Sequence, residues 1–233
     1  MLRIHQFSYA ADNLGYLIFG PRTAMAVDGG AVKELLCFVK QEQLTLTCIT
    51  NTHCHGDHTS GNEALLQETA ARYLSPEMSV KTGYVSIDGA VVRVHATPGH
   101  TVDSVVFEVG GILLTGDTLF NGTIGNCFSG DLKAYFQTIK SLMAFPAATL
   151  IYAGHDYVKE SMTVAKELEP GNTAIATYLK RYTPSHVCST LGEELKVNPY
   201  LRFNTPAIVT LLISRGFAVK TEYERWESLM SAT

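Results

Sequence analysis

The sequence predicts an α/β protein in which two β-sheets lie between outer helices, an αββα sandwich with a small helical appendage at its C-terminal end. Three observations lead to this prediction. Short apolar or alternating runs, which are typical of strands, dominate the first part of the 233 residues. Helix-like segments lie between these runs. The strand runs are also clustered and partly joined as hairpins, instead of alternating strictly with helices.

The expected strands begin close to the N-terminus. The first runs are LRIHQF, NLGYLIF, TAMAVD and LTLTCIT, and later runs are VSI, VVRVHA, SVVFEV, GILLTGD and TLIY. Gly110-Gly111 stands between SVVFEV and GILLTGD. This pair is a turn signal and predicts an antiparallel hairpin.

Helices are expected over residues 31–41, 57–68, 131–143 and 157–168. Glu169-Pro170-Gly171-Asn172 then forms a helix stop and a turn, so we expect one domain over residues 1–169 and a helical region over residues 170–233. In that region we expect a helix over 173–182, an irregular stretch over 184–204 and two short helical segments. Only residues 208–213 resemble a strand there.

Composition and charge exclude several classes of protein. Hydrophobic residues make up 46% and charged residues 17% of the chain, which is the balance of a folded protein. The net charge of −4 and the absence of Lys or Arg runs disfavour nucleic acid as a partner. No signal peptide is visible, and no apolar stretch approaches the roughly 18 residues of a membrane-spanning helix. Five cysteines without CxxC spacing favour a cytoplasmic protein over a disulfide framework or a zinc ribbon.

A dense group of metal-ligand side chains directly follows LTLTCIT, in the motif THCHGDH (residues 52–58). Imidazole nitrogens and carboxylate oxygens bind zinc, iron and manganese and leave the metal a strong Lewis acid. Residues two apart in an extended segment project to the same side, so His53 and His55 can bind one ion. Asp57 and His58, at the start of the next helix, can then reach a second ion.

Three later strand ends share one layout, an apolar run followed by a glycine and one ligand-type residue. His100 follows VVRVHA in this way, Asp117 follows GILL, and His155 follows TLIY. Loops along one edge of a rigid sheet commonly carry catalytic residues. We therefore expect His100, Asp117 and His155 to complete a two-metal site.

Other candidate residues are expected to support this site or to lie outside it. Asp28, in AVDGG, follows a strand and is expected to orient backbone or a ligand histidine. Cys54 is expected to point away from the metals as a spacer. His5, His95 and His186 fit no ligand pattern, so we expect structural roles for them.

These residues resemble the metallo-β-lactamase superfamily and, within it, the glyoxalase II (hydroxyacylglutathione hydrolase) branch. The likeness covers nearly the whole chain and rests on THCHGDHTSGN, TPGHT, GDTLF and GHDY, while EPGN and STLGEELKVNPYLR favour the glyoxalase II branch. It implies a catalytic domain before residue 170 and a substrate-side helical region after it. It also implies two divalent ions, with zinc expected and iron and manganese as alternatives. One ion would be held by His53, His55 and His100, the second by Asp57, His58 and His155, and Asp117 would bridge both.

The chain departs from the glyoxalase II pattern where that family binds the glycine end of glutathione. After GDTLF the family typically has a loop resembling GCGKFYEG, whose Lys and Tyr hold this end, whereas IGNCFSG places Asn126 and Phe128 there. Near the C-terminus, EYERWESLM places Glu224 and Glu227 where the family usually has Arg and Lys. Tyr157 matches a family tyrosine near the thiol. We therefore expect Tyr157, Asn126 and Phe128 to bind substrate, with glutathione recognition only partly preserved.

The resemblance implies hydrolysis of a small-molecule thioester, in which an S-2-hydroxyacyl thiol yields a 2-hydroxy acid and a thiol. Divalent ions generate hydroxide near neutral pH, and Asp57 or Asp117 would orient it. A hydrolase of a different acyl ester is an alternative with the same chemistry.

Two alternatives come from other classes of protein. A persulfide dioxygenase would use one iron bound by His100, Asp117 and either His53 or His55, although the tail motifs favour glyoxalase II. A binding or redox module without hydrolytic activity gives no physical reason to keep seven costly polar ligands together. The sequence predicts no oligomeric state.

Overall fold

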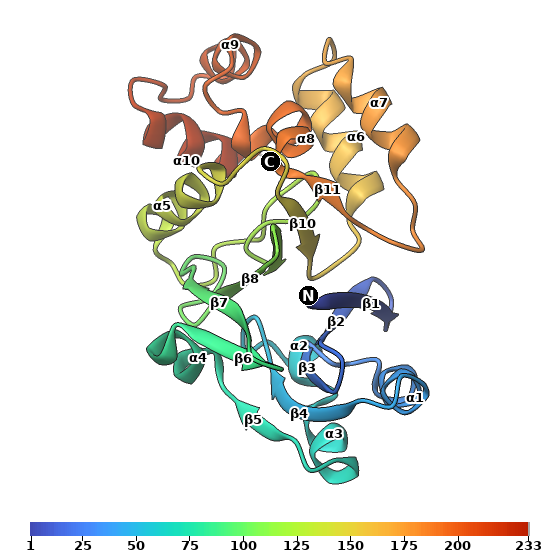
Figure 1. Ribbon diagram of the computed structural model, residues 1–233. Coiled ribbons are helices and arrows are strands. Elements are labelled where there is room, and N and C mark those ends of the chain that lie inside the picture. Colours follow the sequence, from blue (N-terminus) through green and yellow to red (C-terminus); the bar gives the residue numbers. More distant parts are fainter. Residues whose placement is uncertain (233) are drawn as a thin grey trace.

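Two β-sheets lie face to face in the computed structural model, which describes residues 1–232 (Figure 1). The strand order is β1-β2-β3-β4-β5 in the first sheet and β11-β10-β9-β8-β7-β6 in the second. The first sheet contains β1 (Arg3–Tyr9), β2 (Asn13–Phe19), β3 (Thr23–Val27), β4 (Thr45–Thr50) and β5 (Arg72–Leu74). The second contains β6 (Tyr84–Ile87), β7 (Ala90–Ala96), β8 (Val105–Val109), β9 (Ile112–Gly116), β10 (Leu150–Ala153) and β11 (Ser189–Thr190).

Helices cover the outer faces of both sheets. The outer face of the first sheet carries α1 (Val32–Gln41) and α3 (Asn62–Glu68). The outer face of the second carries α5 (Leu132–Met143), α8 (Leu191–Val197), α9 (Pro206–Ser214) and α10 (Glu222–Ala232). The other helices are α2 (Gly56–Thr59), α4 (Pro76–Thr82), α6 (Val158–Leu168), α7 (Ala174–Arg181) and the 3-10 helix η1 (Pro199–Leu201). This arrangement confirms the predicted αββα sandwich with a C-terminal helical region.

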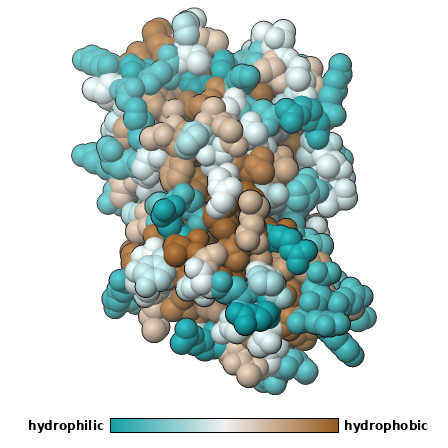
Figure 2. Space-filling model, viewed as in Figure 1, coloured by the Kyte–Doolittle hydropathy of each residue, from teal (hydrophilic) through white to brown (hydrophobic). Residues whose placement is uncertain are grey.

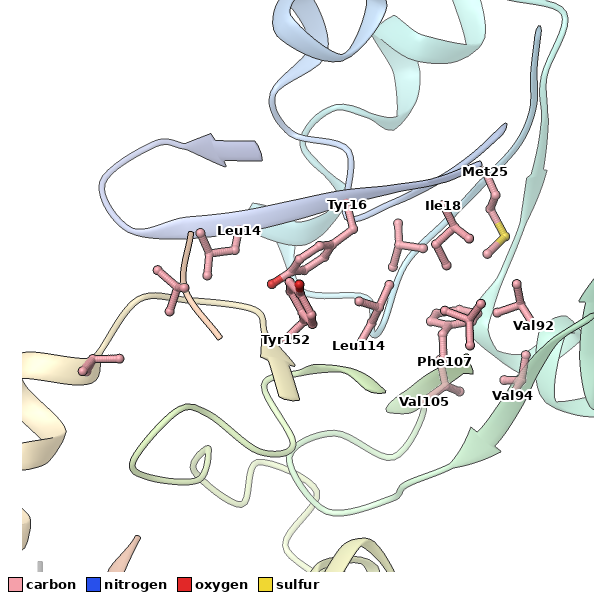
Figure 3. Close-up of a cluster of buried hydrophobic side chains, with 14 of the residues drawn as sticks. Leu14, Tyr16, Ile18, Met25, Val92, Val94, Val105, Phe107, Leu114 and Tyr152 are labelled. Carbon is pink, nitrogen blue, oxygen red and sulfur yellow. The ribbon is translucent and has the colours of Figure 1, made fainter. Parts of the chain in front are cut away.

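Three hydrophobic cores separate the four layers, and the alternation of side chains along the strands produces them. In β2, Tyr16 and Ile18 point between the sheets, whereas Leu17 points to the helices outside. Figure 3 shows Tyr16 and Ile18 facing Phe107 and Tyr152 of the opposite sheet. Every residue of β2 is buried, because both faces of this sheet are covered.

The hairpin predicted at Gly110-Gly111 is confirmed, since β8 and β9 pair antiparallel around it. Both glycines have positive φ, at +58° and +83°, which a type I′ turn requires. The single helix predicted over residues 57–68 is wrong, because it is divided into α2 and α3 at Ser60 and Gly61. A Cβ at Gly61 would lie 2.1 Å from the carbonyl oxygen of Gly29, so the chain turns where it must approach that backbone closely.

Three expectations for the C-terminal region are corrected. The stretch over 184–204 is not irregular, because it contains β11, α8 and η1. Thr190 and Glu193 form a capping box that starts α8, and T-x-x-E is a sequence signal for this motif. Residues 208–213 form part of α9 and not a strand, since Pro206 starts a helix whose buried face carries Ile208 and Leu212. The region does contain a strand, β11, which pairs with β10.

Residues on both sides of position 170 share the hydrophobic core outside the second sheet. Trp226 of α10 is fully buried there and contacts Tyr135 and Phe136 of α5 through their rings. The domain boundary between residues 169 and 170 stays a prediction.

Within the described residues, no helix combines the length and apolar character needed to cross a membrane. Figure 2 shows a face with mostly hydrophilic side chains toward its edges and apolar side chains gathered near its centre.

Candidate metal centre

Loops at one end of the two sheets bring the seven predicted ligands together. The motif of residues 52–58 follows β4 and enters α2, while Asp117 follows β9 and His155 follows β10. Gly116 precedes Asp117 and Gly154 precedes His155, because these two loops approach other parts of the chain closely. A Cβ at Gly154 would lie 2.2 Å from Asp117 Oδ1, so a side chain there would displace this carboxylate.

The first group of ligand atoms belongs to His53, His55, His100 and Asp117, and all of them lie within 4.8 Å of one another. His55 Nδ1 is 2.9 Å from His53 Nε2 and 3.1 Å from His100 Nε2. His53 and His100 are buried. Three ring nitrogens therefore converge on one point, as the ligands of a single ion do.

The second group consists of Asp57, His58 and His155, again with ligand atoms within 4.8 Å of one another. His58 Nε2 lies 3.2 Å from His155 Nε2. Asp57 Oδ2 is 3.5 Å from His58 Nε2 and 3.2 Å from His155 Nε2. The Asp57 side chain is 46% exposed, so this group opens toward solvent.

Asp117 lies between the two groups. Its Oδ2 is 3.6 Å from His100 Nε2 and 3.4 Å from His155 Nε2, which belong to different groups. Its Oδ1 is buried and 3.2 Å from His58 Nε2, yet it forms no hydrogen bond. One carboxylate thus faces both groups, which is the position of a bridging ligand.

Asp28 supports the site as the sequence predicted. It is fully buried, and its carboxylate accepts hydrogen bonds from the backbone N–H of Thr52 at 2.8 Å and from the Thr52 hydroxyl at 2.7 Å. His58 Nδ1 lies 3.0 Å from Asp28 Oδ2. Asp28 therefore fixes the backbone before the motif and orients the ring of His58.

Sequence reasoning missed Asp12 and Asn13, which follow β1 and support the second group. Asp12 Oδ1 is 2.7 Å from His155 Nδ1, and Asn13 Nδ2 donates to Asp57 Oδ2 at 2.8 Å. Asn13 also forms an isolated bridge with His155, which brings the start of β2 against the loop after β10. No local signal in the sequence predicts this contact, because it joins residues 142 positions apart.

The pKa values of the histidines shift in opposite directions in the two groups. Burial, together with the charge of His58, lowers the pKa of His53 to about 4, and burial also lowers the pKa of His100. Burial acts in the same direction on His58, but the carboxylates of Asp28 and Asp117 outweigh it and raise the pKa of His58 to about 11. The pKa of His155 is raised in the same way, against burial, by Asp117 and Asp12.

The remaining histidines and Cys54 lie outside both groups. His95 Nε2 is 2.8 Å from Glu108, His186 Nε2 is 3.0 Å from the Tyr152 hydroxyl, and the His5 ring packs on Phe38. Cys54 is exposed, and its neighbours are Asp103 and Tyr73. All four residues are placed as the sequence predicted.

The three predicted substrate-binding residues border the metal ligands. The ring of Tyr157 stacks on His155 with 5.0 Å between ring centroids. The backbone carbonyl of Asn126 is 2.9 Å from His100 Nδ1. Phe128 is 66% exposed, and its ring lies 5.5 Å from that of His55. Their role in substrate binding stays a prediction.

A pocket of about 320 Å³ opens beside these residues. Its wall includes Asn126, Tyr157 and Met230, the last from α10. Glu224 and Glu227, also on α10, are not among the described residues that line it. Glu224 accepts a hydrogen bond from the backbone N–H of Thr221, and Glu227 accepts one from the Tyr223 hydroxyl. The C-terminal region therefore reaches the pocket through Met230 and η1.

The residues of the two groups fit divalent metal ions. Five imidazoles and two carboxylates converge, and such nitrogen and oxygen donors suit zinc, iron and manganese. The buried Oδ1 of Asp117, which has no hydrogen bond, is a polar atom that an ion would satisfy.

Known proteins match this fold and this set of side chains. A metallo-β-lactamase superfamily model matches residues 14–83 and 79–155, and a model of the hydroxyacylglutathione hydrolase C-terminus matches residues 156–227. The crystal structure of ETHE1 from Myxococcus xanthus superposes with a TM-score of 0.69 and 24% identity, over 99% of this chain and 90% of that one. Fold and site together define a metallo-β-lactamase superfamily protein.

Curated relatives narrow this class. A hydroxyacylglutathione hydrolase from Chromohalobacter salexigens is 31% identical over 82% of each chain. Another, from Erythrobacter litoralis, is 31% identical over 90% of this chain and 91% of its own. The chain belongs to the hydroxyacylglutathione hydrolase family.

Proposed function

We propose that this protein is a binuclear metal-dependent hydrolase of S-2-hydroxyacyl thioesters. The observation that carries the proposal is the position of Asp117, whose two oxygens face two separate groups of ligands. His53, His55 and His100 would hold one ion, and Asp57, His58 and His155 the other. Family membership supports a thioester as the substrate. We expect zinc in the site, with iron and manganese as alternatives because the same donors bind them.

When bound, the ions lower the pKa of a water molecule to about 7, polarise the thioester carbonyl and stabilise the developing oxyanion. The protein must keep the ligands fixed and orient the attacking oxygen. Asp57 suits the second task, because its side chain is half exposed beside the ligands and Asn13 holds it in place. Asp117 is buried between the two groups, so it suits the bridging role.

Hydrolysis joins the oxygen of water to the carbonyl carbon and breaks the carbon–sulfur bond. The products are a 2-hydroxy acid and a thiolate. A thiolate leaves readily, so the reaction needs no strong general acid. Tyr157, Asn126 and Phe128 border the ligands and would position the two ends of the substrate.

The dioxygenase alternative needs only one iron, bound by His100, Asp117 and His53 or His55. It gives no role to the second group, although Asp12, Asn13 and Asp28 hold that group in place. Buried or paired polar residues are costly to keep without a function. The same cost disfavours a non-catalytic module.

The test is to load the purified protein with zinc, iron or manganese, measure bound metal, and follow thiol release from S-D-lactoylglutathione and other thioesters. We expect two ions per chain and thioester hydrolysis. Asp117→Asn is expected to lose metal and at least about 10²-fold in kcat/KM, because one oxygen can no longer carry charge between the ions. Oxygen consumption with a thiol persulfide, in a protein that binds one iron and hydrolyses no thioester, would instead identify a dioxygenase.

We propose the cytoplasm as the place of action. All five cysteines are free, and Cys37 and Cys54 are exposed. Exposed free thiols persist in a reducing compartment. Fractionation of cells that express the protein at its natural level would test this location.

A further inference from the structure

The pocket of about 320 Å³ beside the metal ligands, called the thiol pocket below, has walls from three parts of the chain. The loop Gly122–Asn126 and α6 form two sides, and Pro199, Tyr200 and Met230 close the third. The pocket borders both ligand groups, because Tyr157 stacks on His155 and the Asn126 carbonyl approaches His100. A group attached to the reacting carbonyl can therefore extend into it.

The thiol pocket carries one formal charge, and this charge is negative. Among the described residues that line it, Glu160 is charged and none is Lys or Arg. Glu160 is exposed on α6 and forms no ion pair with the Lys and Arg side chains of residues 1–232. Its carboxylate is free to interact with a ligand.

Nearby cations are directed elsewhere. Lys159, next to Glu160, lies over the ring of Tyr182, which does not line the pocket. On the C-terminal side, Arg225 donates to Asn204 and to the carbonyl of Val219, and Lys140 pairs with Glu222 at 2.8 Å. These three cations are therefore engaged with groups outside the thiol pocket.

Resting on the proposed thioester hydrolysis, we propose that the thiol pocket binds the leaving thiol and selects thiols whose far end carries an ammonium group over thiols that end in a carboxylate. Glu160 is the specificity-determining charge. Its carboxylate would pair with the ammonium group of such a thiol, and it would repel a carboxylate in the same place.

Three matched substrates test the proposal. Each is the S-D-lactoyl thioester of a γ-glutamylcysteinyl thiol, and they differ only in the last group, which is the glycine carboxylate of glutathione, its carboxamide, or an aminoethylamide that carries an ammonium group. In the metal-loaded protein we expect kcat/KM to rise in that order, by about tenfold from carboxylate to ammonium. Glu160→Gln should reduce this range to about twofold, and Glu160→Lys should reverse the order.

Glu167→Lys provides the matched control, because it makes the same charge change on an exposed position of α6 outside the thiol pocket. It should keep the order of the wild-type protein. A wild-type preference for the carboxylate end, or an order that Glu160→Lys leaves unchanged, would overturn the proposal while thioester hydrolysis itself still stands.

A second measurement separates this inference from the proposed function. Calorimetry gives the Kd of the metal-free protein for the three S-methyl thioethers, which cannot be hydrolysed. The same order of affinity, and its reversal in Glu160→Lys, would support selection by charge even if no thioester is turned over. Equal affinities in both proteins would contradict it.

Discussion

The two halves of the candidate metal centre contain similar side chains but differ in what lies behind their histidines. In the first half, His53 Nδ1 faces the Thr52 hydroxyl at 3.1 Å, and His100 Nδ1 faces the carbonyl of Asn126. In the second half, carboxylates lie behind both histidines, at 3.0 Å from His58 and 2.7 Å from His155. A carboxylate behind a ligand histidine fixes the ring and increases its basicity.

This difference gives the halves different charges before metal binds. Lowered pKa values leave His53 and His100 neutral at neutral pH, so the first half is ready to bind an ion. The pKa of His58, raised to about 11, leaves that ring protonated, and the pKa of His155 is raised in the same direction, so the second half holds positive charge against its carboxylates. In the proposed two-metal protein, the first half would therefore be a preformed site, whereas the second would exchange protons for metal.

Removal of one histidine from each half gives the largest expected effects. His58→Ala and His55→Ala should each reduce kcat/KM by about 10³-fold, because each removes a ligand needed to place charge at the carbonyl. Only His58→Ala should also destabilise the metal-free protein, by about 3 kcal/mol, because it leaves the buried carboxylate of Asp28 without its charged partner.

Urea unfolding of the metal-free variants measures this difference in stability. His95→Ala is the control for histidine removal, since His95 pairs with Glu108 away from the site. Equal losses of stability in His55→Ala and His58→Ala would show that the pair between His58 and Asp28 does not stabilise the metal-free protein.

A smaller effect is expected from Asp12→Asn, which tests the support of the second half alone. The substitution keeps the size of the side chain but removes the charge 2.7 Å from His155 Nδ1. We expect the second ion to bind about 10- to 100-fold more weakly, with the first ion unaffected. Metal titration with a chromophoric chelator measures both affinities. Glu108→Gln, which alters a similar carboxylate–histidine pair outside the site, should change neither.

The same comparison explains which parts of the site the sequence could predict. The seven ligands stand in local patterns, either a dense motif after β4 or a single residue after a strand and a glycine. Asp28 follows a strand in the same manner. Asp12 and Asn13 have no such pattern, because their function depends on a contact between the turn after β1 and the loop after β10. That contact forms only when the two sheets pack.

The fold shows the same division between local and tertiary causes. The longer strands of both sheets were predictable, since their apolar faces alternate with period two or fill a strand covered on both sides. Strands β5 and β11 were missed, because three and two residues are too few to show a period. Residues 208–213 were misassigned because the run IVTLLI suits a strand as well as a buried helix, and periodicity cannot separate them in so short a run. These residues form a helix because Pro206 suits a helix start and because Ile208 and Leu212, four residues apart, are buried in one core with α5 and α10.

The smallest expected effect is the number of protons released on metal binding, and it tests the origin of the difference between the halves. At pH 7.5 the first ion meets His53 and His100 already neutral, so it should release close to no protons from them. The second ion must displace a proton from His58, whose pKa is raised to about 11, together with whatever proton the raised pKa of His155 keeps on that ring. It should therefore release one to two protons, and its affinity should fall by up to about tenfold per proton for each unit by which the pH decreases.

Calorimetric titrations in two buffers of different ionisation enthalpy count these protons. Asp28→Asn keeps every ligand but removes the main charge that raises the pKa of His58, so it should lower the count for the second ion and leave the first unchanged. Equal counts for both ions in the wild-type protein would mean that the carboxylates behind His58 and His155 orient the rings without holding protons on them.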